Sequence, residues 1–252
     1  MFELTTEITL LLICAAFVAG FVDAIAGGGG LITLPALLLA GVPPVTALAT
    51  NKIQGLFGAG MAAITYARAG HVNLRRQLKP AVLSFFAALF GALSVNALPT
   101  DLIRWILPVL LVAIALFFAL KPGLDDTDRH QRLTPAVFSL TLVPLIGFYD
   151  GLLGPGTGAF FMLAFVAMVG HGILRATAHT KLLNFASNVG GLAGFLIVLS
   201  PLWAIGLAMG AAQIAGAYLG SSLASRIGAR LIKPLLVIAS TAMALKLITD
   251  LL

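Results

Sequence analysis

The hydrophobic positions of this chain fall into long, nearly continuous runs that short polar stretches separate. A helix needs about 20 apolar residues to cross a bilayer. By that measure the pattern predicts eight long helices, at roughly 8–26, 45–67, 79–97, 102–120, 134–153, 173–199, 201–222 and 231–249. Two shorter runs, 31–40 and 159–169, would as helices reach across only about half of the hydrocarbon layer.

Each short run follows a glycine-rich break. A helix that begins inside a membrane presents unpaired N–H groups and the positive end of its dipole, and glycine lets a ligand approach the backbone closely. Broken helices of transporters hold anionic groups in this way. A glycine run alone is also typical of a hinge, but its occurrence twice favours an anion site. The two breaks are Gly27-Gly28-Gly29-Gly30 and Gly154-Pro155-Gly156-Thr157-Gly158.

The chain repeats itself internally. The segment 20–23 (Gly-Phe-Val-Asp) corresponds to 147–150 (Gly-Phe-Tyr-Asp) at an offset of 127, since 147 − 20 = 127, and Lys52 corresponds to Lys181 at an offset of 129, since 181 − 52 = 129. Such self-similarity indicates two structural repeats. We expect an N-terminal repeat at 1–123 and a C-terminal repeat at 124–252, joined by a polar linker at 121–132, each with four long helices and one short helix.

The distribution of Lys and Arg predicts the topology, because cytoplasmic loops are enriched in these residues. If the short helices do not cross, eight crossings place Arg75 and Arg76 on the opposite side from Arg226 and Arg230. If they complete a crossing, there are ten crossings, the two repeats are inverted, and the loop cations share the cytoplasmic side. We therefore expect an all-α polytopic membrane protein of two inverted-topology repeats, with both termini in the periplasm.

Composition excludes several classes of protein. The chain is 60% hydrophobic and 10% charged, with a mean hydropathy of +1.07, which is typical of a membrane protein and not of a soluble domain. The net charge of +6 is scattered, so nucleic acid is not an expected partner. The sequence has no zinc-protease, nucleophile-elbow or Walker motif, so we expect no catalytic residues, no metal, no cofactor and no enzyme activity.

Four charged residues lie within predicted spans: Asp23, Lys52, Asp150 and Lys181. Charges at this depth are costly and are typical of functional sites. One interpretation is a pair of static, neutral Lys–Asp contacts. Amides and hydroxyls on the same helix faces favour the other, a site for an anion with several acceptor oxygens. Its candidate residues are Gly27, Gly28, Gly29, Gly30, Asn51, Lys52, Gln54, Gly154, Gly156, Thr157, Gly158, Thr180, Lys181, Asn184 and Asn188.

Three titratable side chains are candidates for proton coupling. Asp23 and Asp150 each precede a break by four residues, and we interpret them as counter-charges for the lysines or as proton carriers. His179 is a candidate proton relay, with a hydrogen-bonded packing residue as the alternative. The expected partners are therefore a small anionic substrate and the lipid bilayer. The pairs Gly206/Gly210 and Gly216/Gly220 permit close helix contact, either within the chain, which we favour, or in a homodimer.

These motifs together resemble the TauE/SafE sulfite exporter family, and the resemblance covers essentially the whole chain. It rests on the two break segments, on the segment around Lys52 (Ala-Thr-Asn-Lys-Ile-Gln) and on that around Lys181 (Thr-Lys-Leu-Leu-Asn-Phe-Ala-Ser-Asn). The resemblance implies a multi-pass secondary transporter of the bacterial inner membrane. It also implies substrate contact at 27–30, Asn51, Lys52, 154–158, Thr180, Lys181 and Asn184.

The resemblance also supplies the substrate class, which composition does not: sulfite, sulfoacetate or another organosulfonate. Pro155 and Thr157 depart from the plainer glycine pattern of the family, which bears on the identity of the substrate. We expect proton-coupled transport by alternating access, with export on family grounds. A passive anion channel and a transporter of another small organic anion are the alternatives, whereas two buried lysines argue against cation transport.

Overall fold

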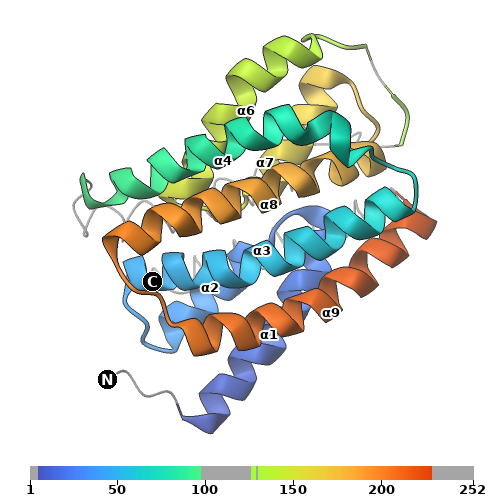
Figure 1. Ribbon diagram of the computed structural model, residues 1–252. Coiled ribbons are helices and arrows are strands. Elements are labelled where there is room, and N and C mark those ends of the chain that lie inside the picture. Colours follow the sequence, from blue (N-terminus) through green and yellow to red (C-terminus); the bar gives the residue numbers. More distant parts are fainter. Residues whose placement is uncertain (1–4, 98–125, 129, 229–252) are drawn as a thin grey trace, which may run out of the picture.

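A computed structural model describes residues 5–97, 126–128 and 130–228 of the chain. Throughout these ranges the regular structure is helical (Figure 1). The long helices are α1 (Thr6–Ala26), α3 (Pro44–Arg68), α4 (Leu78–Leu93), α6 (Pro135–Leu152), α8 (Ile173–Val198) and α9 (Trp203–Ile227). The short helices are α2 (Gly29–Leu39) and α7 (Thr157–Ala164), and three further turns are η1 (Leu74–Gln77), η2 (Ser94–Ala97) and the π-helical η3 (Phe165–Val169).

The helices lie where the hydrophobic pattern predicted them, apart from shifts of a few residues at their ends. Local sequence explains several of the boundaries. The Thr5 and Thr134 hydroxyls accept the N–H groups of Ile8 and Val137, which caps α1 and α6. Gly27 ends α1 in the left-handed conformation with a φ of 79°. The predicted helices at 102–120 and 231–249, and half of the linker at 121–132, lie outside the described residues.

Four of the helices, α1, α6, α8 and α9, are long and apolar enough to cross a membrane. Two others were also predicted as long spans. Of these, α3 carries Asn51, Lys52 and Gln54 in its first half, and α4 has only 16 residues. Large apolar side chains such as Leu11, Phe90 and Leu140 are exposed on the outside, as expected for a lipid-facing surface. The chain is thus a multi-pass helical membrane protein, while the span count and the inverted repeat stay predictions.

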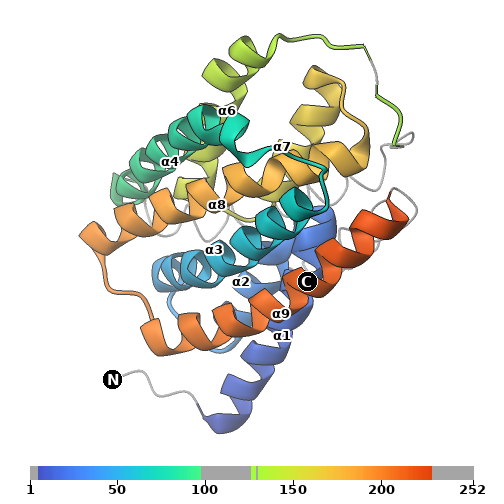
Figure 2. The same ribbon diagram turned by 45° about the vertical axis from the view of Figure 1, so that its right-hand side comes forward.

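The helices pack in two groups (Figures 1 and 2). Each group contains one long helix from the other predicted repeat. In the first group, α9 from the C-terminal repeat packs along α1 and α3. In the second group, α4 from the N-terminal repeat packs along α8 and α6, and α7 contacts α8. The contact between α3 and α8 joins the groups. A compact packing group is therefore not the same as a sequence repeat.

The small residues of α9 serve packing within the chain. A Cβ at Gly216 or Gly220 would collide with the backbone of α1 at Phe17 or Phe21. A Cβ at Gly206 or Gly210 would press on side chains of α3. Close helix approach of this kind is the usual role of small residues in membrane helices, and it fits the interpretation that we favoured from the sequence.

Candidate functional site

The two glycine-rich breaks meet at the centre of the described structure. The Ala159 N–H donates to the Gly27 carbonyl oxygen at 2.9 Å, so the end of α1 is bonded to the first turn of α7. A Cβ at Gly158 would lie 2.8 Å from the Gly27 Cα, closer than real side chains allow. Glycine is therefore required at this crossing for close backbone approach as well as for its conformation. Two segments 127 residues apart (154 − 27) form one structural unit.

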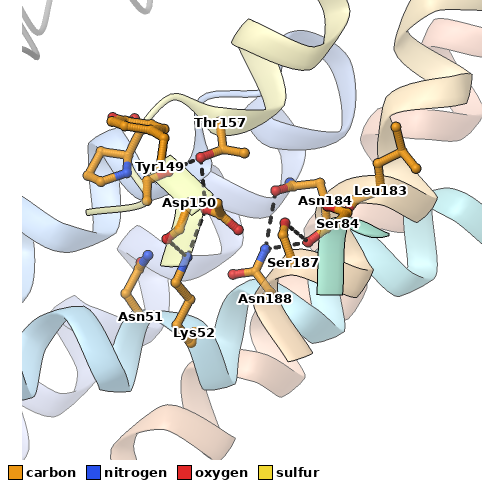
Figure 3. Close-up of polar contacts among 12 residues, drawn as sticks. Asn51, Lys52, Ser84, Tyr149, Asp150, Thr157, Leu183, Asn184, Ser187 and Asn188 are labelled. Carbon is orange, nitrogen blue, oxygen red and sulfur yellow. Dashed lines mark hydrogen bonds and ion pairs between the residues drawn. The ribbon is translucent and has the colours of Figure 1, made fainter. Parts of the chain in front are cut away.

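Lys52 of α3 is paired with Asp150 of α6, across the boundary between the repeats (Figure 3). The Lys52 Nζ lies 2.7 Å from the Asp150 Oδ1 and also donates to the Asp150 backbone oxygen. The Thr157 hydroxyl donates to the same Oδ1 at 2.8 Å. The two charged side chains are 1% and 2% exposed. The other carboxylate oxygen of Asp150, Oδ2, is buried and accepts no hydrogen bond from the described part of the chain.

Lys181 of α8 is paired with Asp23 of α1 in the reciprocal arrangement. The Lys181 Nζ donates to the Asp23 backbone oxygen and lies 3.5 Å from the Asp23 Oδ2. The Gly29 N–H, at the start of α2, donates to the Asp23 Oδ1 at 3.0 Å. The Asp23 side chain is 13% exposed, whereas that of Lys181 is fully buried. Both pairs therefore connect opposite repeats, but the Lys181–Asp23 pair is the longer and the more accessible.

Amide side chains of α3 and α9 form a fixed chain of hydrogen bonds beside the breaks. The Asn51 Oδ1 accepts from the Thr33 hydroxyl at 2.6 Å and from the Gln54 Nε2 at 2.8 Å. The Gln213 Nε2 then donates to the Gln54 Oε1 at 3.2 Å. Because the oxygen of Asn51 is occupied, its orientation is fixed and its amino group remains as a donor.

On the opposite side, α8 contributes two asparagines (Figure 3). The Asn188 Nδ2 donates to the Asn184 backbone oxygen at 2.7 Å and lies 3.2 Å from the Asn184 Oδ1. This contact occupies the Asn184 oxygen and leaves its amino group as a donor. The N–H groups of Gly30 and Gly158, the second residue of each short helix, make no backbone hydrogen bond within the described ranges, as the first turn of a helix dictates.

These groups surround a small polar cavity of about 30 Å³. Most of the residues that the sequence predicted for the site line it, and both short helices begin at its wall. By the usual measure, one water occupies about 10–15 Å³ of such space, so the cavity has room for a molecule of only a few heavy atoms. Its lining includes the predicted residues Asp23, Gly27, Gly29, Gly30, Asn51, Asp150, Gly154, Gly156, Thr157, Gly158, Asn184 and Asn188.

The remaining predicted residues lie behind this lining or away from it. Lys52 and Lys181 are held by the two aspartates, and neither lysine lines the cavity. Gln54 supports Asn51 from behind, and the Thr180 hydroxyl donates within its own helix to the Ala176 carbonyl. Gly28 precedes α2 without lining the cavity. The lysines thus neutralise the wall of the cavity in this structure, and the amides and helix starts face its interior.

Two further residues line the cavity that were not among the candidates, Gly55 and Gln213. Gly55 could have been found from the sequence, because the repeat offset of 129 pairs it with Asn184 (55 + 129 = 184). A Cβ at Gly55 would lie 2.7 Å from the Asn188 Oδ1, so its small size makes room for an asparagine of the other repeat. The signal for Gln213 was a single amide within the apolar run of α9.

His179 lies in a different place, beside a second and larger hollow. That hollow, of about 1250 Å³, lies between η1 and the start of α8 and is called the basic vestibule below. The His179 Nδ1 lies 2.9 Å from the Arg175 carbonyl oxygen, and its ring centroid is 4.8 Å from that of His171. The vestibule is lined by His71, Arg75, Arg76, Arg175 and His179, and by two acids, Asp126 and Asp128.

Two groups next to the start of α8 have an altered pKa: His171 in the loop before the helix and Asp128 from the segment before α6. Burial, together with the nearby His179 and Arg175, lowers the pKa of His171 to about 4. The ring of His171 stacks on Phe165 at a centroid distance of 5.8 Å. The Gly172 N–H, which donates to the Asp128 carboxylate at 2.7 Å, lowers the pKa of that carboxyl group, and Arg175 adds to the effect. His171 is therefore neutral at pH 7, and Asp128 is charged.

The chain matches the protein family described as "Sulfite exporter TauE/SafE" over residues 12–247. It is 57% identical to "Probable membrane transporter protein ORF9" of Sinorhizobium sp over 99% of this chain and 96% of the relative. It is 44% identical to "Probable membrane transporter protein YfcA" of Escherichia coli K12, over 93% and 87% of the two chains. A "Probable membrane transporter protein" of Haemophilus influenzae is 42% identical over 98% and 97%.

No solved structure matches the chain significantly. The three relatives share its length almost completely, and each is named as a membrane transporter rather than as an enzyme. The resemblance that the break and lysine motifs indicated is therefore confirmed over nearly the whole chain.

Proposed function

This chain belongs to the sulfite exporter TauE/SafE family of membrane transporters, and on that premise we propose that it moves a small sulfur-containing anion across the bacterial inner membrane by alternating access. The substrate class is sulfite, sulfoacetate or another organosulfonate. Transport is coupled to protons and directed outward. The family supplies the sulfur and the direction, and the site supplies the reasons for an anion.

The observation that carries the proposal is the meeting of two broken helices at one small polar cavity. Helix starts and amide groups offer N–H donors from several directions, which suits an oxyanion with acceptor oxygens on each side. The N–H groups of Gly30 and Gly158 and the amino groups of Asn51 and Asn184 are the donors. Transporters built on broken helices hold anionic substrates with helix N-termini in this way.

The lysines act in this proposal through the aspartates. Each lysine holds the carboxylate that faces the cavity, so the empty wall is close to neutral and an anion is not repelled. Asp150 is the proton carrier in this proposal, because its Oδ2 is buried beside the cavity and accepts no hydrogen bond from the described part of the chain. Protonation of Asp150 frees the Lys52 ammonium for an anion, which couples proton binding to substrate binding.

Alternating access follows from the inverted topology that we propose for the two repeats, with ten crossings and both termini in the periplasm. The moving bodies are the two packing groups, one of α1, α2, α3 and α9 and the other of α4, α6, α7 and α8. Their common boundary contains both ion pairs and the cavity. The basic vestibule lies on the cytoplasmic side in this topology, where its arginines attract anions.

A passive anion channel is the alternative function, together with a carrier of another small organic anion. The cavity of about 30 Å³ favours a carrier, since a conducting pore needs a continuous polar path. Its size also favours a small inorganic anion over a long organic one in the conformation described. Electrical recording separates the functions, because a channel conducts without a proton gradient and a carrier shows flux without single-channel steps.

The decisive experiment is uptake and release of sulfite and sulfoacetate in proteoliposomes that contain the purified chain. With the proposed mechanism, an imposed pH gradient drives accumulation, and chloride or acetate in the same assay does not compete. The variants Lys52→Ala and Lys181→Ala abolish flux, while Arg68→Gln, an exposed cation outside the site, retains it. Normal flux in both lysine variants would contradict the site assignment.

A further inference from the structure

We propose that the chain has a specific site for an anionic phospholipid, in a groove between α4 and the start of α6, separate from the transport cavity. The groove has a volume of about 990 Å³. Its walls are predominantly apolar, and cations lie at one end. The proposal follows from the way these two helices diverge, from the side chains that the divergence exposes, and from the position of the cations.

The groove lies beside a close contact between α4 and α6. Near the end of α6, a Cβ at Gly151 would collide with the Ala88 backbone, and a Cβ at Gly147 would lie 2.9 Å from the Ser84 carbonyl oxygen. The first turns of α6 instead rise away from the first turns of α4 (Figures 1 and 2). A wedge-shaped opening is left between residues 78–83 and 135–140.

The walls of this opening suit acyl chains. Leu78, Val82 and Leu140 line it and are 55%, 52% and 68% exposed. Phe138 and Phe165 form its buried floor, with ring centroids 4.6 Å apart. Apolar surface of this extent in a helix that faces the bilayer is covered by lipid tails, so the bilayer itself supplies an occupant.

The end of the groove at the start of α4 suits an anionic headgroup. Arg76 and Lys79 line it there, next to the N-terminal turn of α4, whose dipole also favours negative charge. Arg175 lines both the groove and the basic vestibule. Basic pockets between membrane helices are typical sites for anionic lipid headgroups. A lipid whose phosphate lies at Arg76 and Lys79 can place its acyl chains along Val82 and Leu140. Such a lipid suits both the cationic end and the apolar walls of the groove.

A buried acceptor at the same end refines the choice of lipid. The Gln77 Oε1 is buried and has no hydrogen-bond partner in the described structure, and Gln77 lines the groove. A buried acceptor without a donor is costly. The headgroup of phosphatidylglycerol carries hydroxyl groups that can donate to it, together with a net negative charge for the two cations. Phosphatidylglycerol is therefore the lipid that fits best.

The test measures lipid binding to the full chain in detergent by native mass spectrometry, with dioleoyl phosphatidylglycerol as the probe. Phosphatidylcholine and phosphatidylethanolamine with the same chains test the charge, and soluble glycerol phosphate tests whether the tails are needed. We expect phosphatidylglycerol to bind on the order of tenfold more tightly than phosphatidylcholine, from two cations near the phosphate. Equal binding of both lipids, or equal binding of glycerol phosphate, would overturn the proposal.

Variants locate the site. The double variant Arg76→Gln/Lys79→Gln is expected to lose the preference for phosphatidylglycerol, whereas Arg68→Gln, an exposed cation in the last turn of α3, keeps it. Val82→Trp fills the groove and should weaken binding of any lipid there, and Leu11→Trp on α1 is its matched control. If the double variant keeps the full preference while folding normally, the cations do not form the site. If the groove instead binds a second copy of the chain, dimers appear that phosphatidylglycerol does not displace.

Discussion

Lys52 and Asp150 lie 98 residues apart in the chain, yet the ammonium group of one lies 2.7 Å from the carboxylate of the other in a fully buried contact. Lys181 and Asp23 form the reciprocal pair at 3.5 Å. Each lysine therefore pairs with the aspartate of the other predicted repeat and not with that of its own. This exchange ties the two glycine-rich breaks together, and it sets the charge at the boundary between the packing groups.

Removal of one partner from the Lys52–Asp150 pair should destabilise the protein strongly. Lys52→Met leaves the Asp150 carboxylate uncompensated in a buried place, which costs about 3–5 kcal/mol of unfolding free energy. Lys52→Met/Asp150→Asn removes both charges and should recover most of the loss. Thermal unfolding in detergent measures both. A double variant no more stable than Lys52→Met would show that the pair is not what stabilises this contact.

Gly27→Ala should abolish transport by blocking the contact between the breaks. Gly27 has a φ of 79°, and an added Cβ would collide with the backbone of Gly158 and Ala159. Gly70→Ala is the matched control, because Gly70 has a φ of 80° but nothing within 4 Å of an added Cβ. Strain from a left-handed residue, about 1–2 kcal/mol, is then common to both variants. Flux assays should separate them; similar losses of flux would mean that strain alone is responsible.

Asn51→Ala and Asn184→Ala should weaken substrate binding, because both residues line the cavity and their occupied oxygens leave the amino groups as donors. Loss of one such hydrogen bond costs about 0.5–1.5 kcal/mol, which corresponds to a rise in KM of roughly two- to tenfold. Thr180→Val is the control, because its hydroxyl is bonded within α8 and does not line the cavity. Concentration-dependent flux provides the measurement. A larger effect at Thr180 than at the two asparagines would favour the assignment made from the sequence motif.

Acid should destabilise the N-terminal end of α8 through His171. Its pKa is lowered to about 4, against about 6.5 in an unfolded chain. The unfolded state therefore binds the proton more readily, so stability is fully present above pH 6.5 and falls as the pH decreases toward 4. His171→Gln removes this loss, and the exposed His130→Gln does not. Melting temperatures at pH 7.5 and 5.0 test the difference, and equal acid sensitivity of the wild type and His171→Gln would contradict it.

Much of the site could be predicted from the sequence. Apolar runs set the helix positions, because burial in lipid requires continuous apolar residues. The repeat offset placed the breaks and lysines in equivalent positions, and most of the residues chosen on that basis line the cavity. Gln213 was missed because no glycine-rich break and no charged residue lies near it in α9 to mark it as part of the site. His179, the candidate proton relay, lines the basic vestibule and not the cavity, and its proposed role stays a prediction.

The sequence by itself determined the helices of the described ranges, the two breaks and the four charges within predicted spans, since each depends on hydrophobicity and local conformation along one segment. Only the tertiary structure decided which lysine meets which aspartate, that α4 and α9 pack with the opposite repeat, and that the lysines stand behind the cavity wall. The physical reason is that these outcomes depend on where helices cross. A crossing depends on the fit of small residues from distant segments, such as Gly27 against Gly158, and no periodicity within one segment encodes that fit.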